Sequence, residues 1–355
     1  MGAMLQFSKD DTTFYKGLGI LMIVIHNYCH WTPGFGLENE ESFNKEHVYT
    51  FISYLQTFNF KTIFAAVFAF LGHYGVQIFI FFSAYGLTIQ YQGKKSSDLK
   101  FLLTKLKKIY FLLGFAIMVA VSFNFVLGNM INPKSVLWET FLLASTVSSF
   151  SNIYLYKLFS GPYWFFALII QLYVLYPIFY KLFLKFTREN IWLLFIILYI
   201  LIYPLHYYTA QNHFTLFGNI IGHLPEVFLG IALARYRDIN CGFVGVLVAS
   251  LVFVGSQFYE VLFPLSFLSV TIILLYLFRY IQGLTNEYFR GTILFTGQIS
   301  MILFVVNGPL RGVSLYNISD QALRTERVLW FLVILYFVSY ILFNVYRKIC
   351  SKLKI

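Results

Sequence analysis

Long apolar runs recur along the whole chain, and they restrict its possible folds more than any other feature. Ten runs, each roughly 18–22 residues long, are bounded mostly by charged residues, glycine or proline. About 20 apolar residues are what an α-helix needs to cross a bilayer. A membrane-spanning strand must belong to a closed barrel and shows period-two alternation, which these runs lack. The sequence therefore predicts an all-α, polytopic membrane helix bundle with about ten transmembrane helices.

The predicted spans are residues 14–31, 73–92, 107–128, 162–184, 190–209, 214–235, 241–259, 262–281, 291–310 and 328–346. Two weaker apolar stretches, 51–71 and 135–150, contain Lys61 and Glu139. They are expected to be half-buried or re-entrant helices in loops outside the cytoplasm. Composition agrees with a membrane protein, because 12% of the residues are charged, against about a quarter in globular chains.

The distribution of lysine and arginine predicts the orientation. With both chain ends on one side, that side holds 19 of these residues and the opposite side holds 7. Positive charge accumulates on the cytoplasmic side, so the N-terminus and the C-terminus are predicted to be inside, with loops 32–72 and 129–161 outside. The net charge of +11 follows from this topology and from attraction to lipid headgroups, so no nucleic-acid partner is expected. One integral domain, residues 1–355, in the cell membrane accounts for the chain.

The first span holds the clearest candidate for chemistry. His26 lies roughly one to two helical turns before Trp31, where this span is expected to end. A titratable side chain in a bilayer usually marks a functional site, and a buried neutral imidazole is a good general base. Asn27 and His30 are candidates to orient it; the alternative is a core histidine that is satisfied by a neighbouring helix. No HExxH motif or cysteine cluster accompanies the His26/His30 pair, so no metal is expected.

A basic segment follows the second span. Residues 93–108 contain six lysines, among them Lys105 and Lys108. A cluster of this density on the cytoplasmic side is suited to binding the phosphates of a nucleotide-containing donor. The alternative is an anchor for lipid headgroups.

Six segments in this order resemble the acyltransferase-3 family: residues 16–26, 75–86, 105–110, 163–168, 229–235 and 297–307. The resemblance covers nearly the whole chain. It implies a bacterial integral membrane enzyme that moves an acyl group, usually acetyl, from acyl-coenzyme A to a hydroxyl of a cell-surface polysaccharide or a lipid-linked glycan precursor. It also implies that acyl-coenzyme A is a donor substrate rather than a permanently bound cofactor.

The resemblance carries the family's essential histidine over to His26, and its two basic donor-binding positions over to Lys105 and Lys108. Both lysines stand where the family has arginine, so charge is kept while planar bidentate phosphate recognition is lost. Asn307 occupies a position where the family often has a histidine, and the family's Ser-Gly pair is Ser83-Ala84 here.

The hypothesis that follows is that His26 deprotonates the acceptor hydroxyl as it attacks the donor thioester, with a covalent acyl-histidine as the variant. Other polar residues are candidates to line the substrate path, or alternatively are interhelical hydrogen-bond partners. They are Lys16, Asn27, His30, Ser83, Trp164, Gln171, Glu226, Gln298, Ser300 and Asn307.

Two further features leave alternatives open. Loop 32–72 carries four glutamates near its start, which fits either a cap over a site or a solvated loop. A transporter or glycan exporter is the main alternative function, because proline-broken spans and buried polar groups also occur in transporters. The lack of evident inverted repeats argues against a transporter. A purely structural scaffold leaves His26 and the lysine cluster unexplained.

Overall fold

The computed structural model describes residues 6–94, 96–128, 131–150, 161–212, 214–236, 242–315 and 320–353. Within these ranges every regular element is a helix, which confirms the all-α prediction. The α-helices are α1 (Lys9–His30), α2 (Lys45–Leu55), α3 (Phe60–Leu71), α4 (Gly75–Gln92), α5 (Asp98–Val126), α6 (Pro133–Ala144), α7 (Trp164–Phe183), α8 (Ile191–Gln211), α9 (Leu224–Arg235), α10 (Gly242–Phe258), α11 (Ser266–Leu284), α12 (Glu287–Gln298), α13 (Ser300–Ser314), α14 (Gln321–Glu326) and α15 (Val328–Leu353).

Short 3-10 turns interrupt or precede several of these helices. They are η1 (Gly72–Tyr74), η2 (Val147–Phe150), η3 (Gly161–Tyr163), η4 (Leu216–Gly218) and η5 (Glu260–Leu265). The turn η1 joins α3 to α4, so that the helical segment runs from Phe60 to Gln92.

Six helical segments of the described chain are long and apolar enough to cross a membrane: Phe60–Gln92, Asp98–Val126, Trp164–Phe183, Ile191–Gln211, Glu260–Leu284 and Val328–Leu353. The pair α12–α13 adds a seventh if it counts as one span, although its two helices meet at 73°. Residues 51–71, which the sequence predicts as a half-buried or re-entrant helix outside the ten spans, form the end of α2 and all of α3, and α3 is part of the candidate span Phe60–Gln92.

The prediction of one continuous span over residues 214–235 was wrong. Helix α9 has 12 residues, about 18 Å, which is shorter than the hydrocarbon core of about 30 Å. The Ile220 backbone N–H donates to the Gln171 side chain (2.9 Å) instead of to a helical carbonyl. Pro225 lies in the first turn of α9, where its missing N–H is tolerated. The chain therefore turns before α9 begins.

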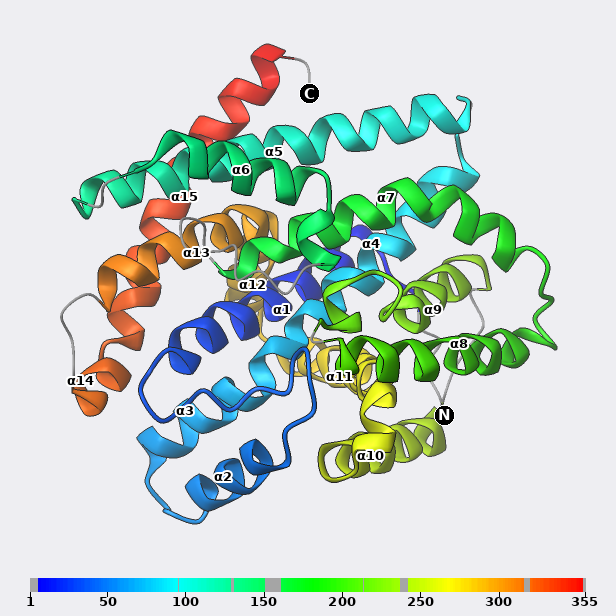
Figure 1. The fold of residues 1–355 in the computed structure, drawn as a ribbon, viewed down its shortest axis with the longest axis horizontal. Helices are drawn as coiled ribbons and strands as arrows, with labels where there is room; N and C mark the ends of the chain where they lie inside the picture. The colour runs from blue at the N-terminus through cyan, green and yellow to red at the C-terminus, as the bar shows by residue number, and fades with distance from the viewer. Residues whose placement is uncertain are drawn as a thin grey trace.

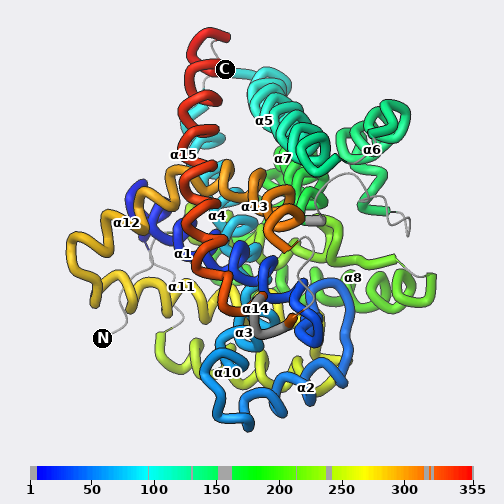
Figure 2. The backbone as a smooth tube through the Cα atoms, turned by 90° about the vertical axis from the view of Figure 1, so that its left-hand side faces the viewer, coloured from blue at the N-terminus to red at the C-terminus, as the bar shows by residue number. Residues whose placement is uncertain are grey.

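Helix α1 is the centre of the bundle, and it packs against α3, α4, α12 and α13 (Figures 1 and 2). Ser8 and Asp11 form a capping box that fixes its start. Glycines allow α12 to approach closely: a Cβ at Gly17 would lie 2.2 Å from the Ile293 carbonyl oxygen, and one at Gly297 would lie 1.9 Å from that of Thr13. Small residues at such crossings are typical of membrane helix packing.

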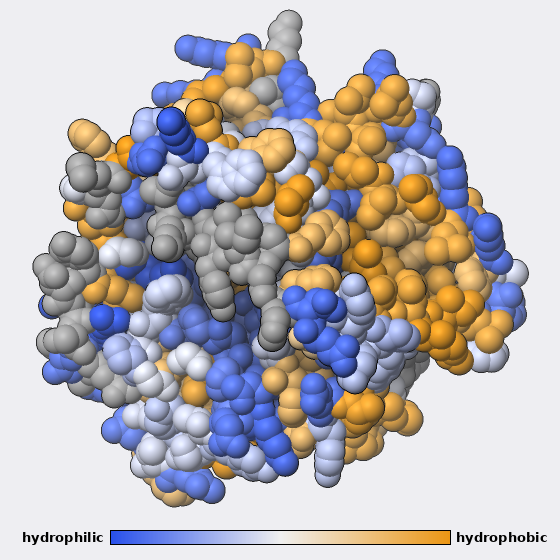
Figure 3. Space-filling view, viewed as in Figure 1, coloured by the Kyte–Doolittle hydropathy of each residue, from blue (hydrophilic) through white to orange (hydrophobic). Residues whose placement is uncertain are grey.

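Apolar side chains are exposed on the outer helices. Most of the α8 side chains are exposed, including Trp192, Ile196 and Ile200. Figure 3 shows hydrophobic surface on its right-hand side, over α7 and α8, while a hydrophilic hollow lies nearer the centre. The exposed apolar surface is the kind that a bilayer covers.

Candidate active site

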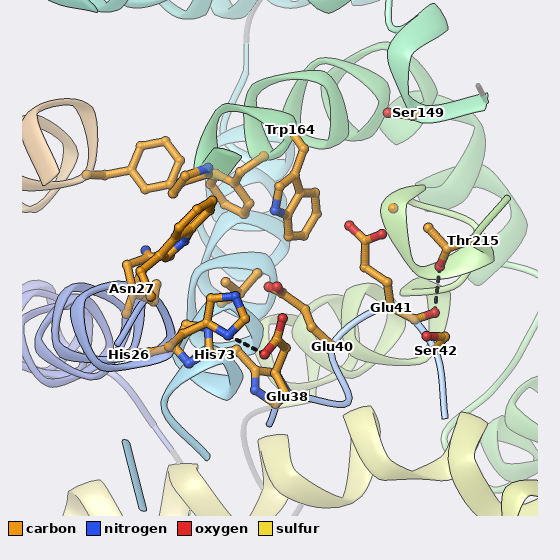
Figure 4. A pocket seen from close by; sticks show the side chains of 18 of the residues that line it. His26, Asn27, Glu38, Glu40, Glu41, Ser42, His73, Ser149, Trp164 and Thr215 are labelled. Carbon is orange, nitrogen blue, oxygen red and sulfur yellow. Dashed lines mark hydrogen bonds and ion pairs between the residues drawn. The ribbon is translucent and has the colours of Figure 1, made fainter. Parts of the chain in front are cut away.

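A cavity of about 510 Å³ lies at the C-terminal end of α1. Its walls come from α1, the α1–α2 loop (residues 31–44), the starts of α2, α4 and α7, the turns η1 to η4, and α13. Figure 4 shows side chains from these elements pointing toward one another. This volume is in the range of small-molecule binding sites.

His26 lies in the wall of this cavity with one ring nitrogen already engaged. The side chain is 4% exposed, and Nδ1 lies 3.1 Å from the Phe68 carbonyl oxygen. A carbonyl only accepts hydrogen bonds, so Nδ1 must carry the proton and donate it. The lone pair of the neutral ring is then on Nε2, which makes no hydrogen bond of normal geometry in the described part of the chain, although the Ala69 backbone lies near the ring. The tautomer therefore presents a free basic and nucleophilic nitrogen.

Gly72 makes the close approach of η1 to His26 possible. A Cβ at Gly72 would lie 2.6 Å from the His26 Cβ, so any other residue would force the two segments apart. The turn η1 also brings His73 beside His26, with 5.5 Å between the ring centroids. His73 is 2% exposed and lines the cavity. The Phe70 carbonyl lies near its ring, but neither ring nitrogen makes a hydrogen bond of normal geometry.

His30 lies one turn further along α1 and has a charged partner. Its ring stacks on that of His26, with 5.5 Å between centroids and 25° between planes. Its Nδ1 contacts the carboxylate of Glu38, which accepts a hydrogen bond from the protonated nitrogen. Burial acts to raise the pKa of Glu38, but the hydrogen bond that His30 donates and the electrostatic attraction of that ring outweigh it and hold that pKa below its usual range. The carboxylate therefore stays ionised beside His30.

The α1–α2 loop forms one wall of the cavity and is held from outside. The Tyr54 hydroxyl donates to the Gly34 carbonyl oxygen (2.9 Å), and the Thr215 hydroxyl donates to that of Glu41 (2.7 Å). His47 Nδ1 lies 3.0 Å from the Glu38 carbonyl oxygen, to which it donates. Of the two alternatives that the sequence left open, the cap agrees with this arrangement.

Two arginines hold the end of α1. Arg311 donates to the Asn27 carbonyl oxygen (3.1 Å), and Arg324 donates to that of Trp31 (3.0 Å). The Arg311 guanidinium also lies 4.7 Å from the centre of the Trp31 ring. Cations are favourable at a helix C-terminus, so these contacts fix the helical turn that carries His26 and His30.

Glu40 and Glu41 line the same cavity from the loop. Enclosure by the cavity walls and the negative charges of Glu41 and Glu38 raise the pKa of Glu40 well above its usual range. Glu41 is exposed to solvent at the rim of the cavity, where partial desolvation by the neighbouring protein and the charge of Glu38 raise its pKa. A carboxyl whose folded-state pKa is raised favours folding when protonated and opposes it when ionised.

Replacing Glu40 with glutamine is therefore expected to stabilise the protein at alkaline pH. The stability of the wild type falls as the pH rises from the unfolded pKa, near 4.5, through the raised folded value. Thermal unfolding in detergent should thus show a higher Tm for Glu40→Gln at pH 8 and no advantage at pH 4. The exposed Glu46→Gln is the control. A Tm difference that does not change with pH would contradict the assignment.

A fully apolar pocket adjoins the cavity. Ile20, Met301 and Phe79 line it together with four residues that it shares with the cavity, Ile23, Val76, Phe165 and Phe304. Its volume of about 10 Å³ holds one water-sized group at most.

The lysine cluster lies apart from the cavity. Lys105 Nζ donates to the Gln90 side chain on α4, whereas Val76 on the same helix lines the cavity. These two α4 residues are 14 positions apart, which is about 21 Å of helix. Lys108 is exposed one turn beyond Lys105, and Lys95 lies outside the described residues.

The structure brings together His26, Asn27, His30 and Trp164 from among the residues that the sequence suggested. The others do not line the cavity: Lys16 and Ser83 are half-buried in α1 and α4, Gln171 and Glu226 are buried in α7 and α9, Gln298 is exposed at the end of α12, and Ser300 and Asn307 are buried in α13. Gln171 bonds Asn219 and Ile220, and the Glu226 carboxyl lies 3.9 Å from His223. In the described ranges no group of three His, Cys, Asp or Glu residues could hold a metal ion.

Glu38, Glu40 and His73 are cavity residues that sequence reasoning did not single out. The glutamates gave a signal, because they crowd the start of a loop that was recognised as a possible cap. His73 gave none, since its place beside His26 depends on how α3 folds back onto α1.

Comparison with known proteins adds one match. The acyltransferase-3 family model, described as an acyltransferase domain, matches residues 13–346, a range that contains every residue lining the cavity. No curated protein and no solved structure matches the chain.

Proposed function

The chain belongs to the acyltransferase-3 family, and from this premise we propose that it transfers an acyl group, in the first instance acetyl, from acyl-coenzyme A to a hydroxyl of a cell-surface polysaccharide or a lipid-linked glycan precursor. The observation that carries the proposal is the hydrogen bonding of the two ring nitrogens of His26. Its Nδ1 is occupied by the Phe68 carbonyl, while Nε2 is free at the wall of a cavity of about 510 Å³. Acyl transfer to an alcohol needs such a nitrogen, either as a base for the hydroxyl or as a nucleophile for the thioester.

The cavity lining fits a sugar acceptor. Trp31, Trp164 and Phe165 present aromatic surface, and Asn27 and Ser42 add hydrogen-bonding groups. Aromatic rings with polar groups around them suit a ligand that has both apolar faces and hydroxyls.

The donor is proposed to bind with its phosphates at Lys105 and Lys108 and its pantetheine arm directed toward His26. The helical distance of about 21 Å between Gln90, which bonds Lys105, and Val76 is one that the arm can cover. The apolar pocket between α1 and α4 lies on this line and is narrow, so the helices around it must separate slightly for the arm to pass.

Neutralising both lysines should weaken donor binding without changing the chemical step. We expect Lys105→Gln/Lys108→Gln to raise KM for acetyl-coenzyme A about tenfold, because each loses a charge-assisted contact, while kcat changes little. Lys107→Gln is the matched control, since Lys107 lies on the opposite side of the same helical turn. An unchanged KM would remove the lysines from the donor site.

The proposal is tested with purified protein in lipid nanodiscs. Radiolabelled acetyl-coenzyme A is added with and without a crude lipid-linked glycan extract, and free thiol and label in glycan are followed together. Equal amounts of thiol and labelled glycan are expected. Movement of intact substrate across proteoliposomes without thiol release would instead establish a transporter.

A further inference from the structure

The two stacked imidazoles of the cavity are anchored to groups of different charge. His26 donates to a neutral backbone carbonyl, that of Phe68. His30 faces the carboxylate of Glu38, whose own backbone carbonyl accepts from His47. The His26 ring is therefore held by a neutral carbonyl dipole, and the His30 ring by a negatively charged carboxylate.

This difference assigns the rings different chemistry. A carboxylate stabilises an imidazolium, so a ring paired with it accepts a proton readily, as in a Ser-His-Asp triad. A carbonyl fixes the tautomer but offers far less stabilisation to a full positive charge. His30 is thus the better proton acceptor. His26 is left to act as a nucleophile through the neutral lone pair of Nε2, and the acyl-imidazolium formed there, which the carbonyl stabilises little, gives up its acyl group readily.

Their positions agree with this assignment. His26 is 4% exposed and lies one turn after Ile23, which lines both the cavity and the apolar pocket. The His30 side chain is 23% exposed and lies about 6 Å further along α1. An acceptor that enters from the solvent side meets His30 first.

We propose, building on the function proposed above, that His26 carries the acyl group and that His30, paired with Glu38, is the general base for the acceptor hydroxyl. His26 Nε2 attacks the thioester carbonyl carbon, the carbon–sulfur bond breaks, and coenzyme A leaves as a thiolate. The proton stays on Nδ1, hydrogen-bonded to the Phe68 carbonyl oxygen, so the acyl group is carried as an acyl-imidazolium whose positive charge the thiolate balances. His30 Nε2 then removes the acceptor proton as the hydroxyl oxygen attacks the acyl carbon and the bond to His26 breaks. His30 finally passes this proton to the thiolate or to water, which closes the cycle.

The two half-reactions separate the roles experimentally. Rapid mixing of nanodisc-embedded protein with radiolabelled acetyl-coenzyme A, without acceptor, measures the first half as a burst of thiol and as hydroxylamine-sensitive label on the protein. The wild type, His30→Gln and Glu38→Gln are expected to give a burst of about one equivalent. His26→Gln gives none. Addition of the glycan extract should discharge the wild type at least about 100-fold faster than either His30→Gln or Glu38→Gln, because a positioned base contributes about 10²–10⁴.

His206→Gln, a histidine outside the cavity, is the control and should match the wild type in both halves. Equal Tm values would show that the variants are folded. Wild-type discharge rates in His30→Gln and Glu38→Gln would overturn the base, and label transfer by the wild type without a protein-bound intermediate would overturn the acyl-histidine. If the wild type neither releases thiol nor labels glycan, the proposed function fails, and this inference fails with it.

Discussion

Replacing His26 with alanine is expected to lower acyl transfer by at least about 10³-fold. Both the base and the nucleophile roles depend on Nε2, and removal of such a group costs orders of magnitude in rate. The measurement is thiol release from acetyl-coenzyme A in the presence of the glycan extract. His26→Gln should be equally inactive, because its amide keeps a donor for the Phe68 carbonyl but supplies no basic nitrogen.

The loss of activity supports a catalytic role for His26 only if both variants are still folded. His26 is buried beside Gly72, so alanine leaves space that the glutamine variant largely fills. Both variants should therefore be judged by size-exclusion profile and Tm alongside activity. A His26→Ala protein with wild-type turnover would exclude this residue from the reaction.

The second large effect is expected at Gly297, where alanine should destabilise the bundle by about 3 kcal/mol, as severe overpacking does. The added Cβ would lie 1.9 Å from the Thr13 carbonyl oxygen, and backbone cannot move aside as a side chain tip can. Helices α1 and α12 would have to separate. Thermal unfolding in detergent measures the change.

Gly291→Ala is the matched control for this prediction. Gly291 is on the same helix, and a Cβ there would meet nothing within 4 Å. Alanine should be neutral or stabilising at this position by about 0.5–1 kcal/mol, because it favours the helix over glycine. Equal Tm values for Gly297→Ala and Gly291→Ala would mean that the α1–α12 crossing tolerates separation.

Local features of the sequence were enough to predict the helical class, the family and the placement of His26 near one end of its helix. Apolar run length and the order of short motifs determine these properties, and both can be read along the chain. The grouping of Asn27, His30 and Trp164 with His26 also follows in part from spacing, because the first two share the last turns of one helix. The catalytic role of His26 remains a prediction.

Other features depend on contacts between distant segments. His73 reaches His26 only because η1 passes against α1 at Gly72. The predicted span 214–235 is interrupted because the Gln171 side chain competes for the Ile220 N–H. Neither contact can be predicted from the residues around it in the sequence. A hydropathy profile counts apolar residues and contains no information about a hydrogen bond or a close approach from another helix.

In the α1–α2 loop, the residues that hold the backbone differ from the residues that face the cavity. The side chains of Tyr54, His47 and Thr215 lie outside the loop and donate hydrogen bonds to its backbone carbonyl oxygens. Glu40, Glu41 and Ser42 belong to the loop and line the cavity. Residues of α2 and Thr215 therefore help to fix the path of the loop, and Glu40, Glu41 and Ser42 can change without removing these hydrogen bonds. A loop of this kind is a natural place for acceptor preference to diverge among descendants of one ancestor, and the first place to redesign it in the laboratory.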